Sequence, residues 1–158
     1  AVSRDAARGD HTGNRGVVMK TIVVGSDGSP ATVGAVQAAA DLAADTGAKV
    51  HLVVACPVPV AVALDAVAVP SHHEVRAASG HALEGHAEQV RRRGIETEIH
   101  VCDGSAATVL CDVAEAVDAD IIVVGDRRLQ GAGRFLGSVA SRVAHHAPCS
   151  VFIAKTCD

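Results

Sequence analysis

Residues 121–138 read IIVVGDRRLQGAGRFLGS, a short apolar run of β-branched residues followed by a long loop that contains glycine. The run ends at Gly125, and the loop closes on Gly137-Ser138, just before apolar residues spaced like the buried face of a helix. This order suits phosphate, because glycines let the backbone approach an anion while free N–H groups and the helix dipole attract it. The stretch therefore predicts a strand, a phosphate-binding loop and a helix N-terminus.

The rest of the chain alternates between strand-like and helix-like patterns. Short runs rich in valine and isoleucine predict strands at residues 21–25, 50–55, 95–101, 121–124 and 150–155. Helical spacing of apolar residues predicts helices at residues 31–44, at 71–93, from Ser105 to about 117, and at 138–146. Strands joined throughout by helix-length connections predict an α/β fold, an open doubly wound parallel sheet with right-handed crossovers.

Two of the expected strands end alike. Residues 22–27 read IVVGSD and residues 122–126 read IVVGD, so we expect these strands to be neighbours at the centre of the sheet. In open α/β sheets, ligands bind in the crevice beyond the carboxyl ends of such strands. Residues 95–101 alternate between apolar and polar side chains, which favours a strand near an edge. Residues 56–70 are apolar but bounded by prolines, and they predict a packed loop or lid.

Composition excludes several classes of partner. The chain has 158 residues, a formal charge of −4 and two aromatic residues, Phe135 and Phe152. It therefore lacks the basicity and the stacking side chains of nucleic-acid binders, and it has no apolar run near the roughly 18 residues of a membrane span. Residues 1–18 have no apolar segment, which predicts a disordered leader or cloning remnant rather than a signal peptide. Residues 19–156 are expected to form a single domain.

Cysteine and histidine are frequent but form no local metal or catalytic motif. The five cysteines include no CxxC pair, which predicts reduced thiols in a cytoplasmic protein rather than disulfides or a zinc ribbon. No catalytic residue is assigned, because no Ser-His-Asp or Cys-His set is recognisable by its order. No metal site is expected either, because no i, i+4 pair and no zinc spacing to a cysteine occurs among His72, His73, His81, His86, His145 and His146.

Several segments resemble the signature of the universal stress protein family. They are Val123-Val124-Gly125, Gly137-Ser138-Val139 and the HAPCSV run at 146–151, and residues 22–29 (IVVGSDGS) are similar to that family's first strand and loop. The resemblance covers about residues 19–156. It implies an adenine-nucleotide-binding sheet of five strands in the order 3-2-1-4-5, with helices on both faces. It also implies frequent dimerisation through the last strand, here Val151, Phe152, Ile153 and Ala154.

The family's nucleotide-binding pattern is a glycine, two residues, a second glycine, eight or nine residues, and then Gly-Ser or Gly-Thr. Gly125 and Gly137-Ser138 match the ends of this pattern, whereas Arg128 stands at the second glycine. Arg128 either blocks the phosphate site, where the family glycine permits close backbone approach, or places its guanidinium on the phosphates. Both readings stay open at this point.

The resemblance also implies contacts to the nucleoside. Asp27 matches the aspartate that ends the family's first strand, although it is also good turn chemistry within Ser-Asp-Gly-Ser. The end of the second strand, Val54 to Cys56, would line the adenine. The expected nucleotide contacts are Gly25, Ser26, Asp27, Val54, Ala55, Val124, Gly125, Asp126, Arg127, Arg128, Gly131, Arg134, Gly137, Ser138 and Val139.

The function that the resemblance implies is that of a cytoplasmic, homodimeric stress protein that binds ATP, with or without magnesium, as a regulatory ligand. At most slow hydrolysis is expected, because the sequence shows no dedicated catalytic base and no magnesium-binding carboxylate beyond Asp126. The alternative, which Arg128 favours, is a family member that has lost nucleotide binding and acts as a dimeric interaction module. A third reading, an adenylating enzyme of the wider fold, would need a catalytic set that the sequence does not show.

Overall fold

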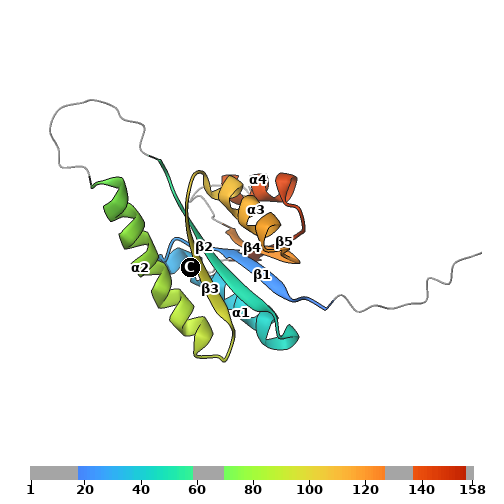
Figure 1. The fold of residues 1–158 in the computed structure, drawn as a ribbon. Coiled ribbons are helices and arrows are strands. Elements are labelled where there is room, and N and C mark those ends of the chain that lie inside the picture. The colour runs from blue at the N-terminus through green and yellow to red at the C-terminus, as the bar shows by residue number, and fades with distance from the viewer. Residues whose placement is uncertain (1–17, 59–69, 127–136, 156–158) are drawn as a thin grey trace, which may run out of the picture.

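The computed structural model describes residues 18–58, 70–126 and 137–155. Its five strands are all parallel and lie in the order β3-β2-β1-β4-β5, which confirms the predicted fold class and strand order (Figure 1). The strands are β1 (Thr21–Gly25), β2 (Lys49–Cys56), β3 (Thr97–Asp103), β4 (Ile121–Asp126) and β5 (Ser150–Lys155). The helical elements are the 3-10 turn η1 (Pro30–Thr32) and the helices α1 (Val33–Thr46), α2 (His72–Arg91), α3 (Ala106–Ala116) and α4 (Ser138–His146).

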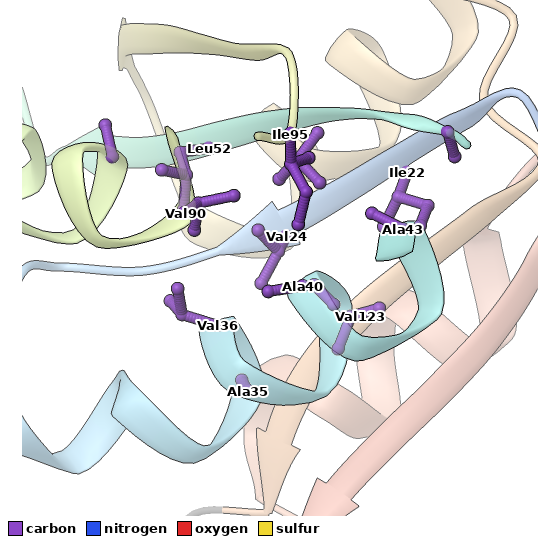
Figure 2. Packing of buried hydrophobic residues seen from close by; sticks show 14 of the residues in the cluster. Ile22, Val24, Ala35, Val36, Ala40, Ala43, Leu52, Val90, Ile95 and Val123 are labelled. Carbon is purple, nitrogen blue, oxygen red and sulfur yellow. The ribbon is translucent and has the colours of Figure 1, made fainter. Parts of the chain in front are cut away.

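Helices cover both faces of the sheet. Alternate side chains of a strand point to opposite faces, so Ile22 and Val24 of β1 belong to one core and Val23 to the other. The first core packs against α1 and α2, and Figure 2 shows Ala40 of α1 close to Val24. The second core packs against α3 and α4. Because the buried face of α1 is mostly alanine, this helix can lie close to the strands.

β1 and β4 are neighbours at the centre of the sheet, as the similar endings of their sequences predict. Val23 pairs in register with Ile122. The Asp120 carboxylate accepts hydrogen bonds from the backbone N–H groups of Lys20 and Thr21, at 2.7 and 2.9 Å, and so ties the start of β4 to the start of β1. β3 lies at one edge of the sheet, as its alternating sequence predicts, and β5 lies at the other.

The starts of α1 and β3 lie two residues beyond their predicted positions, 31 and 95. The α-helix α1 begins at Val33 rather than at residue 31, because Ser29-Pro30 starts a 3-10 turn. It ends at Thr46, and the next residue, Gly47, has a φ of 74°, the left-handed conformation that glycine adopts at low cost. β3 begins at Thr97, because Ile95 is buried in the first core where the chain turns from α2 into the sheet.

Cys56 is buried, Cys102, Cys111 and Cys149 are partly buried, and these four are free thiols, as predicted. Cys157, most of the leader at 1–18 and most of the predicted loop or lid at 56–70 lie outside the residues that the structure describes. Within the described ranges, no helix is long and apolar enough to span a bilayer.

Candidate functional site

A cavity of about 250 Å³ opens where the carboxyl ends of β1, β2 and β4 meet the N-terminus of α4. This is the position where the strand order reverses. β2 and β3 lie on one side of β1, whereas β4 and β5 lie on its other side. The cavity is lined by Gly25, Ser26, Asp27, Ala31, Thr32, Val53, Val54, Ala55, Ala106, Leu110, Val124, Gly125, Gly137, Ser138, Val139 and Ala140.

The cavity brings together most of the residues predicted from the sequence. Ten of them line it: Gly25, Ser26, Asp27, Val54, Ala55, Val124, Gly125, Gly137, Ser138 and Val139. Asp126 ends β4 in register with Lys155 and is not part of the wall. The remaining predicted residues, Arg127, Arg128, Gly131 and Arg134, lie outside the described residues, so the role of Arg128 stays a prediction.

The sequence did not predict the wall residues that come from η1 and the helices, or Val53 of β2. Thr32 comes from η1, Leu110 from α3 and Ala140 from the first turn of α4. Val53 directly precedes the predicted Val54 and Ala55, so its position in the strand was a usable signal. The approach of α3 had no such local signal, because it depends on how the helix packs on the finished sheet.

The turn between β1 and η1 is held by the side chain of Asp27. Its Oδ1 accepts a hydrogen bond from the backbone N–H of Ser29 at 3.0 Å and lies 3.4 Å from Thr32 Oγ1. Gly28 follows with a φ of 77°, and its backbone lies so close to α2 that an added Cβ would be 2.5 Å from the Cβ of Ala82. Asp27 is therefore a turn residue and also part of the cavity wall.

Ser26, which also lines the cavity, anchors the same turn. Its backbone N–H donates to the carbonyl of Val53 at 2.9 Å. Its Oγ lies 2.8 Å from His86 Nδ1 and 2.8 Å from Thr32 Oγ1, and it accepts from the N–H of Gly28 at 3.1 Å. Burial lowers the pKa of His86, so its ring is neutral at pH 7. One buried hydroxyl thus joins β1, η1 and α2.

The N-terminus of α4 faces the cavity without a side-chain cap. The N-cap residue is Gly137, which has no side chain, whereas α2 and α3 are capped by the hydroxyls of Ser71 and Ser105. The first N–H groups of a helix have no partner within the helix, and the helix dipole adds partial positive charge there. The site therefore combines an apolar wall, a carboxylate and an anion-attracting helix end.

Comparison with known proteins identifies relatives over almost the whole described domain. The model of the universal stress protein family matches residues 19–155. Universal stress protein Rv1636 of Mycobacterium tuberculosis is 31% identical over 154 residues, a match that covers 87% of this chain and 97% of that protein. Universal stress protein Sll1388 of Synechocystis is 40% identical over 74 residues, so this chain matches about half of that relative, 48% of its length.

Solved structures show the same fold. A universal stress protein in complex with cAMP is 29% identical, with a TM-score of 0.68, and the match covers 89% of this chain and 99% of that one. The universal stress protein from Archaeoglobus fulgidus in complex with dAMP is 25% identical, with a TM-score of 0.66 over 87% of this chain and 99% of that one. With its sheet order, its cavity and these matches, the chain belongs to the universal stress protein family.

Proposed function

We propose that this protein binds ATP as a regulatory ligand in a stress response. The observation that supports this most directly is the cavity at the carboxyl ends of β1, β2 and β4, with the N-terminus of α4 at its rim. Family members in complex with cAMP and dAMP support an adenine nucleotide as the ligand. At about 250 Å³, the described cavity is near the lower end of the volumes of small-molecule sites, about 300 Å³.

Each part of the nucleotide has a chemical counterpart in the wall. The apolar side chains of Val53 and Val54 suit the faces of a purine, which is mostly apolar. The Asp27 carboxylate can accept hydrogen bonds from ribose hydroxyls or from the adenine amino group. The phosphates would lie at the N-terminus of α4, where Ser138 can donate both its N–H and its hydroxyl.

Regulation is favoured over turnover by the chemistry of the wall. Among the described residues that line the cavity, Asp27 is the one ionisable side chain, and it holds the turn of β1. The Ser26 hydroxyl is buried and contacts His86, Thr32 and the N–H of Gly28, and these contacts hold the turn after β1. Asp126, at the end of β4, is the carboxylate that we expect beside magnesium carried by the triphosphate.

The first test is direct. Protein purified without added nucleotide is precipitated with acid, the supernatant is examined for adenine nucleotides, and the apo protein is then titrated with ATP. We expect released nucleotide or saturable binding, which Gly137→Val weakens by about tenfold or more because its side chain occupies space at the helix N-terminus. Gly85→Val, at an open position on α2, is the matched control. No release and no binding at millimolar ATP would defeat the proposal.

The second candidate function is a nucleotide-free interaction module. It is favoured by Arg128, which replaces the second glycine of the binding pattern. Arg128→Gly separates the two functions, because tighter ATP binding by this variant means that the arginine obstructs the site, and weaker binding means that it holds the phosphates.

We also propose that the protein is a cytoplasmic homodimer formed through β5. The strand lies at an edge of the sheet, where unpaired backbone groups invite a partner, and Phe152 on it is 41% exposed. The four free thiols of the described residues agree with a reducing compartment. Light scattering of the wild type and of Phe152→Asp tests the interface, since the variant is expected to be monomeric.

A further inference from the structure

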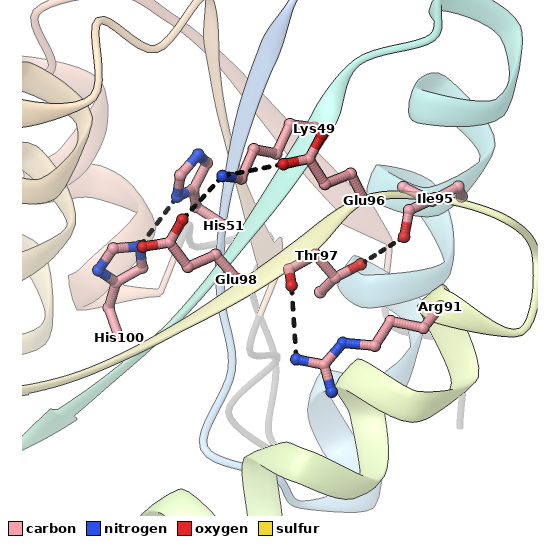
Figure 3. Close-up of polar contacts among 8 residues, drawn as sticks. All are labelled: Lys49, His51, Arg91, Ile95, Glu96, Thr97, Glu98 and His100. Carbon is pink, nitrogen blue, oxygen red and sulfur yellow. Dashed lines mark hydrogen bonds and ion pairs between the residues drawn. The ribbon is translucent and has the colours of Figure 1, made fainter.

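Two histidines and a glutamate meet on the edge of the sheet away from the nucleotide cavity. β2 and β3 are paired so that His51 lies opposite Glu98 and Val53 lies opposite His100. In strands, residues two apart share a face, so Glu98 and His100 project to the same side as His51. Figure 3 shows the three side chains converging, with Lys49 beside them. None of the four lines the cavity.

The ligand atoms of this group are close to the spacing of a metal site. His51 Nδ1 lies 2.9 Å from His100 Nε2, and His100 Nε2 lies 3.9 Å from Glu98 Oε1. All three ligand atoms lie within 4.8 Å of one another. Zinc with bonds of about 2.0–2.1 Å in a tetrahedron separates its ligand atoms by about 3.3 Å. The separations between the ligand atoms therefore need to change by about 0.4 to at most about 1.5 Å to reach that geometry.

Burial and charge favour a cation here. His51 is buried, at 5% exposure, while the side chains of His100 and Glu98 are 21% and 50% exposed. The group is therefore enclosed by protein at His51 and open to solvent at Glu98. Two carboxylates, Glu96 and Glu98, and one ammonium, Lys49, give a local charge of −1. Lys49 Nζ lies 2.8 Å from Glu98 Oε2, so the other oxygen, Oε1, is the one that faces His100.

We propose that His51, Glu98 and His100 form a three-ligand site for a first-row divalent transition metal, with zinc as the expected ion and solvent at the fourth position. Two imidazoles and a carboxylate are ligands that zinc takes, whereas magnesium and calcium prefer oxygen alone. The ion would join β3, an edge strand, to its neighbour β2 by side-chain ligands in addition to the backbone ladder.

The protonation states of the group are compatible with this role. The hydrogen bond from Lys49 lowers the pKa of Glu98, so the carboxylate is ionised at pH 7. Burial, followed by the proximity of His100, lowers the pKa of His51 and keeps its ring neutral. Without metal, one of the two facing ring nitrogens carries a proton and donates it to the other. Metal binding requires a lone pair on each of these two nitrogens, so the donating histidine must carry its proton on its other nitrogen when the metal is bound.

The experiment titrates the metal-free full chain with Zn²⁺ by calorimetry and with Co²⁺ by visible absorption, which reports tetrahedral coordination. We expect one high-affinity zinc ion, with affinity lowered by about tenfold or more in His100→Gln and Glu98→Gln. His81→Gln and His145→Gln, which change exposed histidines elsewhere, are the matched controls and should bind like the wild type. Lys49→Met should bind zinc more tightly, because it removes the positive charge that lies beside Glu98.

Two features keep the test decisive. His100 and Glu98 are partly exposed, so their glutamine variants should fold, and circular dichroism checks this; the buried His51 is therefore not the main variant. The ¹⁵N chemical shifts of the imidazoles give a second measurement, in which zinc must move Nδ1 of His51 and Nε2 of His100. Equal zinc affinity in the wild type and His100→Gln, or the absence of a tetrahedral cobalt spectrum, would overturn the proposal.

Discussion

Replacing Gly28 by alanine tests whether the turn that carries the candidate site is fixed by its contact with α2. The glycine has a φ of 77°, and a Cβ there would lie 2.5 Å from Ala82 Cβ, 2.7 Å from its carbonyl carbon and 2.9 Å from its carbonyl oxygen. Two of these three atoms belong to the backbone of a helix. The clash therefore cannot be relieved by rotating a side chain, and either the turn or α2 must move.

The chain provides matched controls for the backbone contribution. Gly47 and Gly94 have φ values of 74° and 77°, and a Cβ at either would meet nothing within 4 Å. Left-handed conformation alone costs a non-glycine residue about 1–2 kcal/mol. Overpacking adds about 1–3 kcal/mol, so Gly28→Ala should lose about 2–5 kcal/mol of unfolding free energy, and Gly47→Ala and Gly94→Ala about 1–2 kcal/mol.

Urea unfolding followed by circular dichroism measures these differences, and ATP titration gives a second measurement. Since Ser26 and Asp27 immediately precede Gly28 and both line the cavity, the variant should also bind ATP more weakly than either control. A Gly28→Ala protein that is no less stable than Gly94→Ala would refute the idea that this contact positions the turn. Unchanged ATP affinity in a destabilised variant would show that the turn does not contribute to the site.

Three further predictions follow from single contacts. Burial lowers the pKa of His51 and His86 below the unfolded value of 6.5, so the unfolded chain binds more protons at these residues. The free energy of unfolding, measured with urea at fixed salt, should therefore decrease as the pH drops below about 6.5. A flat profile between pH 8 and pH 5 would contradict this. Ser71→Ala removes the capping box with Glu74 and should cost about 1 kcal/mol in the same assay, unlike Ser141→Ala in mid-helix. Asp27→Ala should weaken ATP binding by about tenfold to a hundredfold, because it removes a hydrogen bond to a charged group of about 1.5–3 kcal/mol; equal affinity would remove Asp27 from the site.

The fold could be predicted because its signals are local. Runs such as residues 21–25 have apolar residues at successive positions, which is typical of strands covered on both faces, and serines and glycines mark the helix ends. The crevice beyond the carboxyl ends of β1 and β4 followed from the similar endings of these strands, whereas the individual cavity residues, such as Asp27 and Val54, followed from the resemblance to the family. The start of α1 was wrong because Ser29-Pro30 opens a 3-10 turn, and the start of β3 was wrong because Ile95 packs into the first core before the strand begins.

What the sequence could not provide are contacts between residues far apart in the chain. His86 contacts Ser26 across 60 positions, because α2 packs over the turn of β1. His51 and His100 are 49 positions apart, and only the register of β2 on β3 brings them together. The histidine spacings that argue against a metal site concern neighbours within one helix, and the sheet edge makes a different combination. The spacing of two residues along the chain indicates whether they meet on a helix. It does not indicate which residues meet on parallel strands, because the connection between the strands sets their pairing.

The two proposed sites share β2, and the rigidity of that strand predicts that they act independently. His51 lies in its first half, whereas Val53 and Val54 line the cavity, and every residue from Val50 to Val54 is buried. Energetic coupling between sites needs an element that has two arrangements. A buried strand with a neighbour on each side, such as β2, has only a single arrangement. His100→Gln should therefore bind ATP with the affinity of the wild type when both are measured in chelator, which also avoids the complex that ATP forms with free zinc. A loss of ATP affinity beyond about threefold would mean that the β2–β3 edge moves, and that the side chains of His51 and His100 control the shape of the nucleotide cavity.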